Sequence, residues 1–261
     1  MFLTILFFLL GIGYTVLFTY LVDLMYLIPV WIILGFIASF ISLIVILIVI
    51  YPIFKFTKPN RKFKYVFLKD VSQFINFFLR IKVTAVGTEN IPKDGNLTIY
   101  ANHKSKNDPF LIMAHMNRPL AFTPKISIYK IPVVSWYMHA LGCLPIDRSD
   151  NRRTAKTMIS AIKNVQDGLA MLIFPEGGIL SRNEDKMVDI KAGAYKIGMK
   201  AKSDFLPVSI IGNSKIINKK WYQKMHIKLI FHPVVKFEDV KDLNTIELGE
   251  KMFEIINKDL D

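Results

Sequence analysis

Charge is almost absent from the first part of this chain, and cysteine is almost absent from all of it. Residues 1–54 carry a single charged side chain, Asp23. The sole cysteine, Cys143, excludes an intrachain disulfide and is compatible with a reducing compartment. No basic residue precedes the first apolar run, and that run continues beyond the length of a signal-peptide core. Both features disfavour a cleaved signal peptide.

Two long apolar stretches predict a pair of membrane helices. Met1–Val22 and Val30–Tyr51 are each long enough to cross about 30 Å of hydrocarbon as a helix. Asp23 and Pro29 fall between the stretches, where a short polar turn is required. A hairpin of two transmembrane helices is the simplest interpretation, and a single span beside a helix lying on the membrane is the alternative. Either arrangement attaches the chain to a bilayer.

Basic residues begin where the second apolar stretch ends. Residues 55–82 contain eight Lys or Arg side chains and one acidic residue, Asp70. Positive-inside statistics therefore predict that the rest of the chain faces the cytoplasm from the cell membrane. The net charge of +13 favours a partner bilayer with anionic headgroups. Nucleic acid is not an expected partner, because no helix-turn-helix, zinc or RNP-type pattern occurs.

The remaining pattern predicts an α/β domain. We expect two transmembrane helices over 1–54, a basic juxtamembrane segment with an amphipathic helix over 55–84, and a cytoplasmic α/β domain over 85–261. In that domain a mixed sheet is flanked by helices. An apolar stripe in residues 66–79 predicts a helix that lies in the membrane interface or packs on the soluble core. The expected strands are 97–101, 120–123, 170–174, 205–211 and 227–235, and the expected helices are 109–116, 132–140, 151–167, 191–202 and 244–258.

A histidine and an aspartate lie five positions apart in the segment NHKSKNDP, residues 102–109, directly after an expected strand. The neutral imidazole of His103 can take a proton from a hydroxyl, while the carboxylate of Asp108 fixes its tautomer. No Ser or Cys elbow accompanies the pair, so the expected nucleophile is the substrate's own hydroxyl. Asp108 before Pro109 is also a helix-capping signal, which is the alternative role for this carboxylate. The flanking Lys104 and Lys106 are interpreted mainly as solvated loop lysines.

Three further segments follow in a fixed order: GCLPIDR at 142–148, FPEGG at 174–178 and LPVS at 206–209. With the His/Asp segment they resemble the lysophosphatidic acid acyltransferase family, part of the wider glycerophospholipid acyltransferases, over about residues 86–235. The resemblance implies a membrane-bound enzyme that moves an acyl chain from acyl-CoA or acyl carrier protein to a lysophospholipid acceptor, 1-acylglycerol-3-phosphate. It implies His103 as general base, Asp108 as its partner, and no bound cofactor. No metal is expected, because the sequence shows no clustered His/Cys ligand set.

The later segments supply the expected substrate-binding residues. The resemblance implies a phosphate-binding role for Arg148, whose planar guanidinium suits a phosphate. Glu176, at a strand end, is expected to hold the glycerol portion of the acceptor or to orient a basic group. Gly177 and Gly178 permit a tight turn close to a ligand. Lys191 belongs to a segment that resembles the family's Lys-x-Gly helix start.

Two further cations complete the expected site, and one expected cation is missing. Lys125 lies between the first two segments and is a candidate for donor or phosphate contacts. The family usually continues Glu-Gly-Thr-Arg-Ser, whereas here Ile179 stands at the arginine's place and Arg182 follows as a candidate substitute. This departure leaves another lysophospholipid or lipid acceptor as the alternative. An inactive membrane-shaping scaffold is the alternative of another class, and the intact His103/Asp108 pair argues against it.

Overall fold

The computed structural model describes residues 1–146 and 150–260, and the chain forms two units, Met1–Phe56 and Thr57–Asp261. The first unit consists of helices α1 (Phe2–Val22) and α2 (Ile28–Lys55). Both are long and apolar enough to cross a membrane. They pack against each other as a hairpin, as the sequence predicts. Their insertion across a bilayer stays a prediction.

Small residues bring the two helix backbones of this hairpin together. A Cβ atom added at Gly35 would lie 2.8 Å from the carbonyl oxygen of Gly11 and 2.9 Å from the backbone nitrogen of Thr15. Ser39 Oγ donates a hydrogen bond of 2.7 Å to the carbonyl oxygen of Phe7. Close approach at small residues, reinforced by interhelical hydrogen bonds, is typical of helix pairs in lipid.

The second unit is built on a six-stranded mixed sheet with the order β1-β6-β5-β2-β4-β3. The strands are β1 (Ile81–Val86), β2 (Leu97–Ala101), β3 (Leu120–Phe122), β4 (Ala170–Ile173), β5 (Asp204–Ile211) and β6 (Met225–Phe231). All neighbouring pairs are parallel except β5 with β6. The central strands β2 and β4 are buried along their whole length, as near-continuous apolar runs in parallel sheets are.

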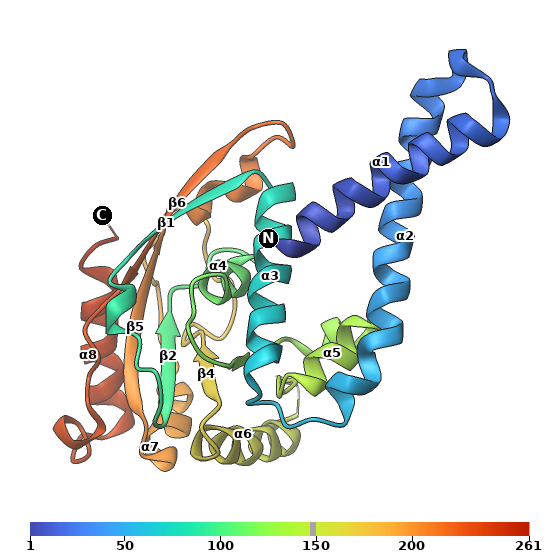
Figure 1. Ribbon diagram of the computed structural model, residues 1–261. Helices are drawn as coiled ribbons and strands as arrows, with labels where there is room; N and C mark the ends of the chain where they lie inside the picture. The colour runs from blue at the N-terminus through green and yellow to red at the C-terminus, as the bar shows by residue number, and fades with distance from the viewer. Residues whose placement is uncertain (147–149, 261) are drawn as a thin grey trace. The chain divides into compact units, whose positions relative to one another are not determined.

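Helices cover both faces of the sheet. They are α3 (Lys62–Phe78), α4 (Asp108–Met113), α5 (Val134–Ala140), α6 (Asn151–Gln166), α7 (Lys196–Ala201) and α8 (Thr245–Asn257). Figure 1 shows α8 on one side of the sheet and α3 with α4 on the other, and α8 contacts β5 while α3 contacts α4 and β1. The predicted class, a mixed sheet flanked by helices and preceded by a helical hairpin, is confirmed.

Three details differ from the sequence prediction. The edge strand β1 was not expected, because it is short and lies in a strongly basic stretch; its exposed Lys82 and Thr84 alternate with more buried apolar residues. The expected helix 191–202 is shorter and begins as a 3-10 turn, Ala192–Tyr195, before α7. On α3 the most buried stripe is not the predicted apolar stripe but Lys64, Leu68, Ser72 and Asn76. A polar stripe can be buried here because each polar side chain finds a hydrogen-bond partner.

Candidate active site

The predicted catalytic segments meet at one edge of the sheet. His103 follows β2, the Phe174–Glu176 segment follows β4, and Asn213 follows β5. These three strands are parallel neighbours, so their carboxyl ends lie together. Such an edge is where α/β folds commonly build sites.

The side chains of His103 and Asp108 are in direct contact. His103 Nδ1 lies 2.8 Å from Asp108 Oδ2, with the imidazole 16% exposed and the carboxylate fully buried. An ionised carboxylate only accepts hydrogen bonds, so Nδ1 carries the proton and Nε2 keeps its lone pair. The ring also stacks on Phe174, with centroids 4.1 Å apart. The imidazole is therefore held in one orientation with a basic nitrogen available.

Asp108 is itself fixed from several directions. Its Oδ2 also accepts hydrogen bonds from the backbone nitrogens of Lys104, at 2.7 Å, and Ser105, at 2.9 Å. Its Oδ1 accepts a hydrogen bond from Asn213 Nδ2. Helix α4 begins at Asp108 with Asn107 as its N-cap residue. The carboxylate of Asp108 therefore binds groups of the His103 turn, and it does not cap the N-terminus of α4.

A buried ion pair lies beneath this turn. Lys104 Nζ is 3.0 Å from Glu176 Oε2, and both side chains are at most 1% exposed. Glu176 Oε1 accepts a 2.7 Å hydrogen bond from the backbone nitrogen of His103. Glu176 therefore supports the turn that carries the histidine and points away from solvent. The interpretation of Lys104 as a solvated loop lysine is wrong, whereas Lys106 is exposed.

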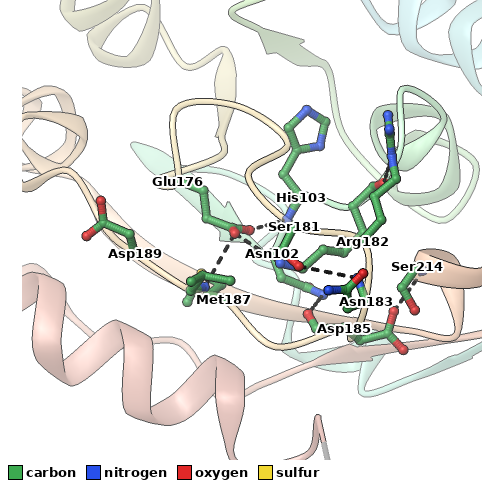
Figure 2. Close-up of polar contacts among 12 residues, drawn as sticks. Asn102, His103, Glu176, Ser181, Arg182, Asn183, Asp185, Met187, Asp189 and Ser214 are labelled. Carbon is green, nitrogen blue, oxygen red and sulfur yellow. Dashed lines mark hydrogen bonds and ion pairs between the residues drawn. The ribbon is translucent and has the colours of Figure 1, made fainter.

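The segment after Glu176 passes back along the His103 turn. Arg182 Nε donates a 3.1 Å hydrogen bond to the carbonyl oxygen of Lys104, and Figure 2 shows Arg182 beside His103 and Glu176. Ile179 and Arg182 both line an open pocket of about 460 Å³, whose other wall includes Ile217. Arg182 lies three residues after the position at which the family usually has an arginine, and it contacts the His103 turn through this hydrogen bond.

Hydrogen bonds tie this returning segment to the sheet. Asn102 Nδ2 donates to the carbonyl oxygens of Asp185 and Ile210, each at 2.8 Å. The carboxylate of Asp185 accepts hydrogen bonds from the backbone nitrogens of Gly212, at 2.6 Å, and Ser214, at 2.9 Å. The same strand end therefore fixes both the segment that carries Arg182 and the start of the chain after β5.

Gly177 and Lys191 lie side by side. Gly177 has φ +70°, and a Cβ atom there would lie 2.9 Å from Cδ of Lys191 and 3.2 Å from its Nζ. The backbone nitrogen of Lys191 donates a 2.9 Å hydrogen bond to the carbonyl oxygen of Pro175. The positive φ favours glycine at 177, and a side chain there would also displace the flexible end of Lys191. Gly178 continues the bend and is half-buried.

The second segment is only partly described. Arg148 lies outside the described residues. Lys125 is exposed and forms a bridge with Ile146, so it belongs with the second segment instead of the His103 turn. Cys143 is buried, and burial raises the pKa of its thiol to about 12. A thiol with such a pKa stays protonated and cannot act as a nucleophile near neutral pH.

The sequence did not indicate the structural role of three residues at this site. Lys104, Asn213 and the ring of Phe174 each contact the His103/Asp108 pair or Glu176. Phe174 stood inside a quoted motif without a role, and Asn213 follows the last motif at a strand end. Within the described part of the chain, no group of three His, Cys, Asp or Glu side chains is arranged to hold a metal ion.

Comparison with known proteins indicates an acyltransferase family. A family model described as Acyltransferase matches residues 82–211. A 1-acyl-sn-glycerol-3-phosphate acyltransferase of Chlamydomonas reinhardtii is 33% identical over 138 residues, which are 52% of this chain and 40% of that protein. One of Borreliella burgdorferi is 30% identical over 169 residues, 64% of this chain and 66% of that protein.

A solved structure agrees with these relatives. The crystal structure of the 1-acyl-sn-glycerophosphate (LPA) acyltransferase PlsC from Thermotoga maritima aligns with a TM-score of 0.65 and 28% identity, over 74% of this chain and 77% of that one. The matched regions cover between 40% and 66% of the length of four of these curated relatives. The ordered motifs, the mixed sheet and these matches lead to one assignment. The chain belongs to the lysophosphatidic acid (1-acyl-sn-glycerol-3-phosphate) acyltransferase family.

Proposed function

We propose that this protein transfers an acyl chain from a thioester donor to the free hydroxyl of 1-acylglycerol-3-phosphate and so forms phosphatidic acid. The observation that carries the proposal is the 2.8 Å contact between His103 Nδ1 and the buried Asp108, which in the neutral imidazole places the proton on Nδ1 and the lone pair on Nε2. The names of the related proteins support the same acceptor. Acyl-CoA and acyl carrier protein are both suitable donors.

The proposed reaction needs no nucleophile from the protein. Nε2 of His103 takes the proton from the acceptor hydroxyl as its oxygen attacks the thioester carbonyl carbon. Asp108 stabilises the imidazolium that forms. When the tetrahedral intermediate collapses, the C–S bond breaks and the departing thiolate receives the proton from His103. The products are the new ester and the free thiol.

Cations around the His103 turn supply the proposed phosphate contacts. Arg182 reaches this turn and lines the adjoining pocket, and Lys191 lies against Gly177 in the neighbouring bend. Arg148 is proposed as a third phosphate ligand from the family resemblance. Ile179 removes one guanidinium from the usual set, so another lysophospholipid is the second candidate acceptor.

The proposed location is the cell membrane, with the α/β unit facing the cytoplasm. Two apolar helices and the basic residues that follow them support this orientation. A bilayer with anionic headgroups and, for one of the two donor types, acyl carrier protein are the proposed partners. The lysolipid acceptor enters from the same bilayer.

Acyl transfer by the purified, detergent-solubilised full chain tests this function. The assay compares wild type, His103→Ala and the control His226→Ala, which replaces an exposed histidine on β6. Each protein is given a labelled acyl thioester of CoA or of acyl carrier protein, together with a panel of lysolipids. We expect phosphatidic acid from wild type and from the control. His103→Ala should be slower by about 10²- to 10⁴-fold, the usual contribution of a general base.

The same assay separates the alternatives. Transfer to a different lysolipid would support the proposed mechanism but show that the acceptor is not 1-acylglycerol-3-phosphate. The difference at Ile179 and Arg182 would then be the first candidate cause of the altered acceptor specificity. If folded wild-type protein transfers no acyl chain from either donor, the proposed enzymatic activity is wrong and the inactive membrane-shaping scaffold is favoured. Equal rates for wild type and His103→Ala would remove His103 as the base.

A further inference from the structure

An exposed aromatic and basic segment joins β5 to β6. Residues 215–224, KIINKKWYQK, contain four lysines and no acidic residue, and we call them the aromatic–basic loop. Trp221 is 84% exposed, Ile217 is 60% exposed and Tyr222 is 50% exposed. Large apolar side chains gathered at this exposure mark a contact surface more often than an ordinary solvated loop.

The loop's own contacts do not account for its composition. The Trp221 and Tyr222 rings meet edge to face, with centroids 5.8 Å apart, and Lys220 Nζ lies 6.0 Å from the centroid of Tyr222. Within the described residues, no carboxylate lies at ion-pair distance from the loop's four lysines. The positive charge of the loop is therefore directed outward.

The loop lies at the same edge of the sheet as the His103 site. It continues from the 3-10 turn Asn213–Asn218, whose Asn213 contacts Asp108. It ends at Met225, which pairs with Ile81 at the start of β1. Because β6 is antiparallel to β5, the start of β6 lies at the end of β5 where the site is.

Exposed apolar residues from a second element lie beside the loop. Phe78 and Leu79, at the end of α3, are 46% and 39% exposed. The backbone nitrogen of Met225 donates a 3.0 Å hydrogen bond to the carbonyl oxygen of Arg80, the next residue. The end of α3 and the end of the aromatic–basic loop are therefore adjacent in the fold, and both carry exposed apolar side chains.

We propose that the aromatic–basic loop docks on the surface of a bilayer that contains anionic lipids. Trp and Tyr prefer the level of the headgroups, where the ring is in an apolar layer and the polar atom stays hydrated. The lysines contact lipid phosphates. An acidic protein would suit the lysines but not the exposed Trp221, Ile217 and Phe78, so the bilayer is the better fit.

This docking surface is separate from the apolar hairpin and does not depend on the proposed reaction. If the reaction is as proposed, docking presents the His103 edge to the layer in which a lysolipid headgroup lies. The test therefore uses a spectroscopic readout at the loop, so that it can fail while acyl transfer succeeds, and the reverse.

Fluorescence of Trp221 in the full chain reports docking directly. The chain has three tryptophans, so Trp31→Phe with Trp136→Phe leaves Trp221 as the sole emitter. The probe is phosphatidylcholine vesicles, with and without phosphatidylglycerol and with bromine-labelled acyl chains. We expect a blue shift and bromine quenching that increase with phosphatidylglycerol and weaken at high salt. The difference between wild type and Trp221→Phe gives the same signal if the double replacement does not fold.

Charge variants with a matched control test the lysines. The loop variant carries Lys219→Gln, Lys220→Gln and Lys224→Gln. The control carries Lys196→Gln, Lys200→Gln and Lys202→Gln, which removes the same charge from exposed positions at the opposite end of β5. We expect the ratio of docked to undocked loop to fall by about 100-fold in the loop variant, about fivefold per lysine, and to stay unchanged in the control.

Three results would overturn the proposal. One is Trp221 emission that stays water-like and unquenched on anionic vesicles. Another is an equal response of the loop variant and the control variant. The third is Trp221 emission that does not change with vesicles but shifts when acyl carrier protein is added. That result would show that the loop binds an acidic protein instead of a bilayer.

Discussion

Among the individual residues of this site, Lys104 and Glu176 form a buried ion pair. It joins the turn after β2 to the bend after β4, at full burial. A buried charge without its partner has lost its hydration, and no ion-pair interaction compensates for that loss. The pair therefore makes the geometry around His103 sensitive to both residues, although neither residue takes part in the proposed proton transfer.

Glu176→Gln should destabilise the fold because it leaves the Lys104 ammonium buried without a counter-charge. We expect the free energy of unfolding to fall by about 3 kcal/mol, measured by chemical denaturation of the full chain in detergent. The double variant Lys104→Met with Glu176→Leu should recover only part of this loss and stay about 1–2 kcal/mol less stable than wild type, because Leu leaves the His103 backbone N–H without its acceptor. Its acyl transfer should stay low, since the His103 backbone nitrogen has lost its acceptor. A single variant as stable as wild type would contradict this account.

Contacts of this kind explain which parts of the site the sequence predicts. His103 and Asp108 are five positions apart, and a turn between a strand and a helix brings them together whatever the sheet order is. Lys104 and Glu176 are separated by 72 positions, and Asn213 and Asp108 by 105. Those contacts depend on β2, β4 and β5 being neighbours, which no local pattern of residues specifies.

At the level of elements, the hairpin of α1 and α2 depends on a close contact of backbones. Gly35 leaves no room for a side chain against Gly11 and Thr15, whereas a Cβ atom at Gly13 would meet nothing within 4 Å. These two glycines therefore differ in role although both stand inside apolar helices. Sequence analysis predicts the helices from hydropathy, but the distinction between their glycines needs the packing.

Gly35→Leu should separate the two helices, and Gly13→Leu is the matched control. The leucine at 35 overlaps backbone atoms, an overpacking that costs about 1–3 kcal/mol. Cysteines placed at Phe7 and Ser39, with Cys143→Ser, report the contact by their rate of disulfide formation in vesicles. We expect the rate to fall about tenfold or more with Gly35→Leu and to be unchanged with Gly13→Leu. Equal rates in the two variants would show that the helices do not meet at Gly35.

The strands illustrate the same division between local and distant information. β2 is predicted with its observed bounds because LTIYA is a short, mostly apolar run rich in β-branched and aromatic residues between polar segments. β1 is missed although Lys82 and Thr84 alternate with apolar residues, because the segment is short and lies in a strongly basic stretch. An edge strand is specified mainly by its partner, here β6, and that partner follows it by more than a hundred residues.

At the level of the whole molecule, acid should weaken the α/β unit. Burial lowers the pKa of His115, which follows α4, and of His232, which follows β6; at His232 the charge of Asp259 opposes this shift and that of Lys258 adds to it. The unfolded chain, with a histidine pKa of about 6.5, then binds more protons than the folded chain. Stability is therefore full above this pH and falls as the pH drops through the window below it.

The replacement His232→Gln should make the unfolding free energy less dependent on pH. We expect the loss of stability between about pH 7.5 and about pH 5.5 to be smaller in the variant than in wild type, with the remainder due to His115 and other groups. Denaturant titrations at the two pH values measure it. An unchanged pH dependence would show that His232 is not protonated preferentially on unfolding.

The ion pair beneath the histidine also has an evolutionary consequence. Lys104 and Glu176 lie in two different motifs, and neither can change alone without leaving a buried charge. Selection should therefore act on them as a unit, and they should covary. Among related sequences that retain this turn, we expect an apolar residue at the position of one to accompany an apolar residue at the position of the other.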